Sequence, residues 1–192
     1  DRYRADPVMR GLRTGVLTRD HRVEATAIAR GTIDYYAARG VELEAPNATS
    51  GPGGELVFVN VPGAARWERY GGRRSLVNVA ESAVVHDLAQ EQARELGGLA
   101  GRVGLLTPFR LQAALLRANL RTRQREAVSS IDQAQGLEFD AVIVSLVVRK
   151  PAHLLRYLSP AKLNVAWSRA RRRLFLVGDF DTFERLYDVA GV

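Results

Sequence analysis

Short apolar runs alternate along the chain with segments in which apolar residues recur three and four positions apart. The apolar runs predict strands at 54–61, 102–108, 127–132, 140–148 and 173–179. Several are apolar without interruption, which is typical of strands that are buried on both faces. The periodic segments predict helices at 23–39, 77–96, 109–121, 159–172 and 181–190. Strands that alternate with helices predict an α/β fold with a mostly parallel sheet and helices on both faces.

The linkers and the domain count follow from composition. With 192 residues, of which 46% are hydrophobic, the chain can bury a sizeable core as one large domain. Glycine and proline concentrate in "EAPNATSGPGG" (44–54) and again in "PGAARWERYGGRR" (62–74). Apart from the strand at 54–61, we therefore expect 44–74 to be a loop-rich segment within a single domain, 1–192.

The charge is strongly positive and comes almost entirely from arginine. The formal net charge is +7, and Lys150 and Lys162 are the only lysines. Two interpretations stay open: an arginine-rich solvated surface, or a polyanionic partner whose phosphates match the guanidinium fork. There is no cysteine, and the three histidines lack ligand spacing, so we expect no disulfide, no thiolate site and no metal held by this chain.

Targeting signals are absent from the sequence. No apolar run is long enough to span a bilayer, and the opening "DRYRADP" has neither an initiator methionine nor a leader. We therefore expect a cytoplasmic, intracellular protein without a membrane partner, and a piece of something longer.

Polar residues stand out where predicted strands end. "TP" (107–108) ends one strand, "DQAQGLE" (132–138) follows another, and Asn164, Ser168 and Arg169 precede the last. Ligands of open α/β sheets bind at the carboxyl ends of the strands, so we expect these residues to gather there. No G-x-x-x-x-G-K-[ST] motif is present, and the chain therefore has no phosphate cradle of its own.

Three stretches, in this order and at these separations, resemble motifs IV, V and VI of superfamily 1 helicases of the Upf-like and Dna-two-like group. They are "LLTPFRLQ", "SSIDQAQGLEFDAVIVS" and "LNVAWSRARRRLFLVGD". "YRADP" (3–7) is similar to the "YRMHP" that opens the second motor domain in that group, and "SLVNVAESAVV" (75–85) is similar to its "SxxNxxEA". The resemblance implies that 1–192 is a second, C-terminal RecA-like domain of the P-loop NTPase type that lacks its own P-loop.

The resemblance implies an ATP-dependent helicase or translocase. Its ATP and Mg²⁺ would be bound mainly by an absent first, N-terminal motor domain. Arg169 in "WSRAR" matches the arginine finger and Arg4 in "YRADP" a second phosphate-contacting arginine, so both are candidate catalytic residues. A cation there can neutralise charge that develops on the transferred phosphoryl group. The alternative for Arg169 is a solvated surface charge.

The remaining candidates follow from motifs IV and V. Gln135, Gly136 and Glu138 are candidate ATP-binding residues, because a glycine lets the backbone approach a ligand and Glu138 resembles the acid near the ribose. Thr107, Pro108 and Ser130 (or Ser129) are candidate contacts to single-stranded nucleic acid. The alternatives are a tight turn at Gly136 and a satisfied strand-end hydroxyl at Ser130. Phe109 and Trp167 could stack on bases, although we favour core packing for Trp167.

Departures from the motifs keep a second function class open. Leu137 gives "GLEFD", which resembles the Rep-like branch of the superfamily. The branches differ in translocation polarity, and "TPFRLQ" and "NVAWSRAR" favour 5′-to-3′ movement. As the partner, single-stranded DNA is favoured over RNA. Ala134 and Asp6 replace a common Phe and a common His of the motifs. The alternative to a motor domain is a non-catalytic RecA-like module that binds nucleic acid or protein.

Overall fold

The computed structural model describes residues 37, 55–61, 65–148, 150, 153, 156–179 and 182. Its strands are β1 (Glu55–Asn60), β2 (Arg66–Tyr70), β3 (Arg73–Val77), β4 (Val103–Thr107), β5 (Val128–Ser130), β6 (Phe139–Ser145) and β7 (Ala170–Gly178). Its helices are α3 (Val79–Leu96), α4 (Arg110–Asn119) and α6 (Pro160–Ser168), with two short 3-10 helices, η4 (Thr122–Ala127) and η5 (Asp132–Ala134).

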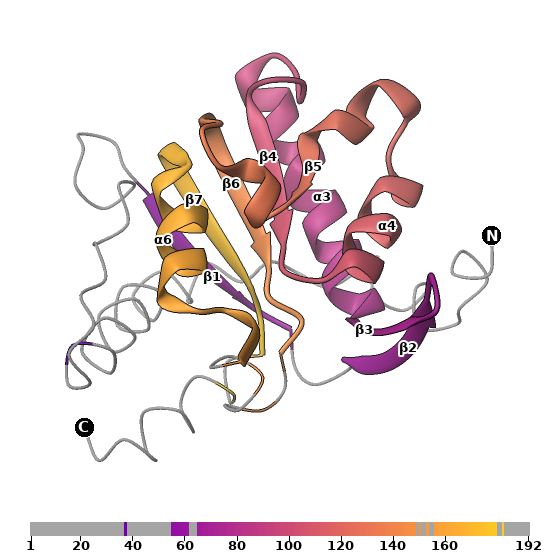
Figure 1. Ribbon diagram of the computed structural model, residues 1–192. Helices are drawn as coiled ribbons and strands as arrows, with labels where there is room; N and C mark the ends of the chain where they lie inside the picture. Colours follow the sequence, from indigo (N-terminus) through magenta and orange to yellow (C-terminus); the bar gives the residue numbers. More distant parts are fainter. Residues whose placement is uncertain are drawn as a thin grey trace.

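A five-stranded parallel sheet forms the centre of the described fold, in the order β1-β7-β6-β4-β5 (Figure 1). Alternate side chains of these strands enter two apolar clusters on the two faces of the sheet. The first cluster joins Val142, Val144 and Leu174 to Leu163 and Trp167 of α6. The second joins Ile143, Phe175 and Val177 to Leu88 of α3 and Leu116 of α4. The predicted α/β RecA-like class, with helices on both faces, is confirmed.

The start of α3 is fixed by its own sequence. Asn78 is the N-cap, and its side-chain oxygen accepts a hydrogen bond from the Glu81 backbone N–H at 3.1 Å. Such a cap satisfies one of the free N–H groups of the first turn and stabilises a helix by about 1 kcal/mol. The helix therefore begins two residues after the predicted position 77, because β3 extends through Val77.

An antiparallel hairpin of β2 and β3 occupies the segment that the composition predicted to be a loop. The prediction for 62–74 is wrong for Arg66–Tyr70 and Arg73–Arg74, which are paired strands. Four of the five β2 residues are exposed, so the segment shows no apolar periodicity. The Gly71-Gly72 turn, with φ of 55° and 76°, was the sequence signal for a hairpin.

The end of α6 also differs from the prediction. The helix stops at Ser168 instead of continuing to 172, Arg169 is its C-cap, and β7 begins at Ala170. Ala170 pairs with Phe139 and Arg173 with Ala141 of β6. Strand pairing therefore overrides the helix propensity of the arginine run.

Some predicted elements lie outside the described residues: the helix at 23–39 apart from Ala37, the loop at 44–54, and the helix at 181–190 apart from Thr182. Over the part of the chain that the structure describes, we find no helix with the length and apolar character needed to cross a membrane.

Candidate functional site

The predicted site residues lie at two opposite edges of the sheet. Thr107, Pro108 and Ser130 lie at or just beyond the carboxyl ends of β4 and β5. Residues 135–138 and Arg169 directly precede β6 and β7, at the amino ends of those strands. Because β5 and β6 run in the same direction, the segment between them must return to the opposite edge. The expectation that all these residues gather at the carboxyl edge is therefore wrong.

Arg169 is anchored at the amino edge by neutral acceptors. Its Nη1 donates to the Leu137 carbonyl at 3.1 Å, and its Nη2 donates to Ser168 Oγ at 2.8 Å. Its Nε donates to the Val165 carbonyl at 3.2 Å, and its own carbonyl accepts from Phe139 N–H at 2.9 Å. Among the described residues it forms no ion pair with a carboxylate. The guanidinium is thus half-buried and oriented, with its charge uncompensated by any described acid.

Residues 135–138 form a tight turn beside Arg169. Gly136 has φ of 83°, and the Leu137 N–H donates to the Ala134 carbonyl at 3.0 Å. A side chain at Gly136 would meet nothing within 4 Å, so the turn faces open space. The alternative of a tight turn is therefore correct for the backbone, and the open space leaves room for a ligand.

Gln135 and Glu138 are both exposed on this turn. Glu138 Oε2 accepts from Arg171 Nε at 2.9 Å, and the two side chains are 54% and 61% exposed. An ion pair this open to water contributes at most about 1 kcal/mol. Glu138 can therefore exchange this partner for a ligand at little cost.

The carboxyl edge presents Pro108 and Ser130 but not the Thr107 side chain. Thr107 is fully buried, so its hydroxyl has no exposed surface with which to contact a nucleic acid. Pro108 is partly exposed. Ser130 Oγ accepts from Gln133 N–H at 3.3 Å, and Ser130 N–H donates to Gln133 Oε1 at 3.3 Å. A strand-end hydroxyl that is already satisfied is thus the correct description of Ser130 in this structure.

Beneath the carboxyl edge lies a buried polar network to which the sequence analysis assigned no role. Glu81 Oε2 accepts from Ser145 Oγ at 2.8 Å and from Val147 N–H at 2.9 Å, while Oε1 accepts from Asn78 Nδ2 at 3.0 Å. Gln112 Nε2 donates to Ser145 Oγ and to the Asn78 carbonyl, both at 3.0 Å. The signal was present in the sequence, since Asn78 and Glu81 have N-cap spacing and Gln112 lies in the first helix after "TP".

Burial raises the pKa of Glu81 to about 8, and the nearby Asp179 carboxylate adds to the rise. The donors from Ser145, Val147 and Asn78 act in the opposite direction without cancelling it. The network ties α3, α4 and the end of β6 together directly behind the strand ends at the carboxyl edge.

The two candidate stacking aromatics are core residues. Trp167 is 3% exposed and Phe109 is 5% exposed, and both belong to the first apolar cluster. Core packing is thus confirmed for Trp167 and also holds for Phe109. Arg4 lies outside the described residues, so its predicted role stays a prediction.

Comparisons with known proteins agree with this architecture. A protein-family model described as "AAA domain" matches residues 15–181. Regulator of nonsense transcripts 1 from Dictyostelium discoideum is 30% identical over 137 residues, 67% of this chain and 10% of that protein. DNA polymerase alpha-associated DNA helicase A from Schizosaccharomyces pombe is 36% identical over 90 residues, 46% of this chain and 14% of the relative. Helicase sen1 from the same organism is 27% identical over 126 residues, 61% of this chain and 8% of the relative. The chain thus spans a small part of each relative's length.

Proposed function

This chain belongs to the AAA domain family, within the Upf-like group of superfamily 1 helicases, and from that premise we propose that it is the second RecA-like motor domain of an ATP-dependent helicase or translocase. In this proposal, a preceding N-terminal motor domain binds most of the nucleotide. The present chain supplies an arginine finger and half of a track for single-stranded nucleic acid.

The observation that carries the proposal is the state of Arg169. Its guanidinium is oriented by Leu137, Val165 and Ser168 but has no described carboxylate partner. An oriented and uncompensated cation at the edge of a domain can reach a phosphoryl group bound by another domain. Charge that spreads over that group in the transition state is stabilised there without reorganisation of the protein.

The residues around Arg169 fit a nucleotide that is held mainly elsewhere. The chain has no P-loop, and the Gly136 turn opens onto free space. In the proposed motor, Gln135, Gly136 and Glu138 contact the nucleotide from this side, and Arg4 supplies a second cation. Mg²⁺ bound with ATP would neutralise phosphate charge, and in this proposal the N-terminal motor domain would hold it.

The nucleic acid is proposed to follow the carboxyl edge of the sheet. Pro108 and Ser130 lie there, and the backbone at these strand ends can position a phosphate without reading the base. Because Thr107 is buried, its contribution is limited to shaping the strand end. Single-stranded DNA is favoured over RNA, and 5′-to-3′ movement is the favoured polarity.

The test is Arg169→Ala and Arg169→Lys in a two-domain protein that places a P-loop motor domain ahead of this chain. An arginine finger contributes on the order of a thousandfold to phosphoryl transfer, and lysine lacks the planar fork. Both variants should therefore lower ATPase turnover about a thousandfold and abolish unwinding, while oligonucleotide binding and the melting temperature stay near those of the unaltered protein.

The matched control is Arg172→Ala. Arg172 is exposed on β7 and forms no described ion pair, whereas the nearer Arg171 contacts Glu138 and is unsuitable. Near-normal ATPase in folded Arg169→Ala would identify this arginine as surface charge. That result would favour the second candidate, a non-catalytic RecA-like binding module, which also needs no phosphate cradle.

A further inference from the structure

The hairpin of β2 and β3, residues 66–77, carries exposed arginine and aromatic side chains on both of its faces. Trp67, Arg69, Tyr70, Arg73 and Arg74 are all exposed. Trp67 and Tyr70 are 37% and 47% exposed, and among the described residues Leu137 is the only other large hydrophobic side chain exposed to this degree. We call these five residues the basic-aromatic hairpin.

Pairing within the hairpin sets like charges against each other. Arg69 lies directly opposite Arg74 in the antiparallel register, and Tyr70 lies opposite Arg73. Like charges directly opposite each other destabilise a strand pair. No described carboxylate forms an ion pair with Arg69, Arg73 or Arg74, whereas Arg66 pairs with Glu68 at 2.8 Å. Arg69 and Arg74 therefore concentrate positive charge on one face of the hairpin, and an anionic ligand would relieve their repulsion.

The Trp67 ring of the hairpin is held in place by neighbouring side chains. The guanidinium carbon of Arg74 lies 5.3 Å from the centre of the Trp67 ring. Tyr157 contacts Trp67 edge-on, with ring centres 6.0 Å apart, and also contacts Phe109 at 5.2 Å. Such contacts orient the Trp67 ring before any ligand arrives, so less side-chain entropy is lost when a base binds.

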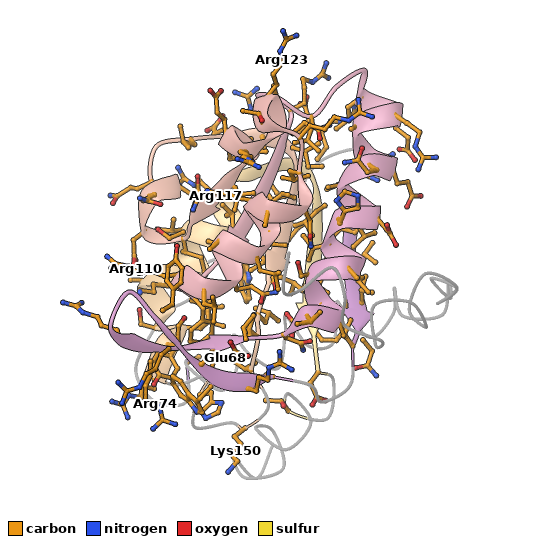
Figure 2. All side chains as sticks on the ribbon, turned by 90° about the vertical axis from the view of Figure 1, so that its right-hand side faces the viewer. Glu68, Arg74, Arg110, Arg117, Arg123 and Lys150 are labelled. Carbon is orange, nitrogen blue, oxygen red and sulfur yellow. The ribbon has the colours of Figure 1, made fainter. Side chains whose placement is uncertain are left out.

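The hairpin lies beside the carboxyl edge of the sheet, next to the proposed track. The Leu111 N–H at the start of α4 donates to Ser75 Oγ of β3 at 3.2 Å, which fastens the hairpin to the helix that follows Pro108. Figure 2 shows Arg74 and Arg110 on the same side of the molecule, with Arg123 at the far end. A single nucleic-acid strand that passes Pro108 would therefore reach the hairpin next.

We propose that the basic-aromatic hairpin is a second contact surface for single-stranded nucleic acid, in which Arg69, Arg73 and Arg74 contact backbone phosphates while Trp67 and Tyr70 stack on bases. This inference rests on the proposed function, because it extends the track at the carboxyl edge. Trp67, Arg69 and Arg74 share one face of the hairpin, and Tyr70 and Arg73 share the other, so a nucleic-acid strand that passes around the exposed tip meets a ring and at least one cation on each face. An acidic protein surface would use the arginines but would leave the rings without a function.

The test is a binding measurement on the 192-residue chain with a fluorescein-labelled, mixed-sequence single-stranded oligodeoxynucleotide between ~50 and ~200 mM salt. The slope of log K against log salt is negative, and each lost phosphate contact reduces its magnitude by about 0.7 for single strands. Arg69→Ala/Arg74→Ala should therefore reduce the magnitude of the slope by about 1.4 and weaken binding. The matched control, Arg123→Ala/Arg125→Ala, removes two exposed arginines from η4 at the other end of the molecule and should leave the slope nearly unchanged.

The stacking part of the inference is tested with Tyr70→Ala and with an abasic strand of equal length. Loss of one base–aromatic contact should weaken binding between about fivefold and a hundredfold at every salt concentration, without a change of slope. The abasic strand should bind Tyr70→Ala and the unaltered chain equally. Tyr70 is at the exposed tip of the hairpin, so this variant keeps the fold even if a change at Trp67 does not.

The outcomes separate the inference from the function on which it rests. Salt-dependent binding that is the same in the Arg69→Ala/Arg74→Ala variant and in the control would overturn the hairpin surface alone. No binding by the unaltered chain would overturn both. If poly-glutamate of equal charge displaced the oligonucleotide as well as unlabelled single strand does, the hairpin would be an acidic-protein site and the inference would be wrong.

Discussion

Glu81 is a carboxyl group without access to water, and three donors converge on it. Its relative exposure is 0%, and its oxygens accept from Asn78 Nδ2, Ser145 Oγ and Val147 N–H. Val147 has φ of 53°, a left-handed conformation that is costly for a β-branched residue. The hydrogen bond from its N–H to Glu81 helps to hold that conformation at the end of β6.

The raised pKa of Glu81 predicts a specific dependence of stability on pH. Between pH 4.5 and about 8, the folded chain keeps this carboxyl protonated, whereas the unfolded chain releases the proton. The folded state then binds more protons, so the free energy of unfolding decreases as pH rises, on the order of 1 kcal/mol per pH unit. Urea unfolding across this window should show the decrease, and Glu81→Gln, which is neutral at every pH, should flatten it.

Glu91→Gln is the control for this measurement, because Glu91 is exposed on the same helix. It should leave the pH dependence of the unaltered chain in place. An equal slope in Glu81→Gln and in the unaltered chain would show that another group titrates in this window.

At the residue scale, the sequence predicted which residues belong to motifs more reliably than it predicted which side chains are buried. Trp167 packs in the core as favoured, in the position where the resembling motif has an apolar Leu. The buried state of Thr107 could not be predicted, since a hydroxyl at the end of a strand faces either water or the core, depending on which helix covers it. The N-cap spacing shows the contact of Glu81 with Asn78, but its other partners, Ser145 and Val147, lie 64 and 66 residues away along the chain, and no local pattern reveals those contacts.

Among the elements, the packing of β4 against the start of β6 depends on Gly104. A Cβ built on Gly104 would lie 2.5 Å from Cδ2 of the Phe139 ring, closer than real Cβ contacts allow. Phe139 N–H also donates to the Arg169 carbonyl. The Phe139 ring packs directly against the backbone of β4 at Gly104, and the Phe139 N–H in turn holds the Arg169 carbonyl just before β7.

We expect Gly104→Ala to displace Phe139 and to destabilise the chain by about 1–3 kcal/mol, the usual cost of overpacking. Urea unfolding gives the free energy. The control is a double-mutant cycle with Phe139→Leu, because the leucine side chain is smaller than the phenylalanine ring. Gly104→Ala should lower the free energy of unfolding by less in the Phe139→Leu variant than in the unaltered chain. Additive costs in the cycle would mean that Phe139 is not the group that the new methyl contacts.

The elements that the sequence predicted correctly are those with continuous apolar runs. β4, β6 and the helices α3 and α4 were all found, because burial on one or two faces leaves a periodic pattern. The hairpin of β2 and β3 was missed because four of the five β2 residues are exposed and the three buried β3 residues are consecutive, so neither strand shows a periodic pattern. The boundary between α6 and β7 was misplaced because the pairing of Ala170 with Phe139 is set by a distant segment.

For the whole molecule, the resemblance of three motifs gave the fold class and the family, and both are confirmed. The arrangement of the candidate site over two edges was not predicted, because the sequence orders segments along the chain but does not say which edge each connection reaches. Arg169 and the Gly136 turn therefore face one end of the sheet, while Pro108, Ser130 and the basic-aromatic hairpin face the other. In the proposed motor, nucleotide and nucleic acid are contacted at separate edges of one domain, and movement of this domain as a rigid body can couple them.

The isolated 192-residue chain should fold but should not hydrolyse ATP. A five-stranded sheet with an apolar core on each face is enough for the chain to unfold cooperatively on heating, and circular dichroism would detect that transition. Turnover requires the β- and γ-phosphates to be held in place, and the chain has no G-x-x-x-x-G-K-[ST] loop to hold them. Arg169 then has no bound phosphoryl group to stabilise, so phosphate release from ATP and Mg²⁺ should stay at background. Release above background that disappears in Arg169→Ala would show that this domain binds and hydrolyses the nucleotide by itself, and the division of the site between two domains would have to be abandoned.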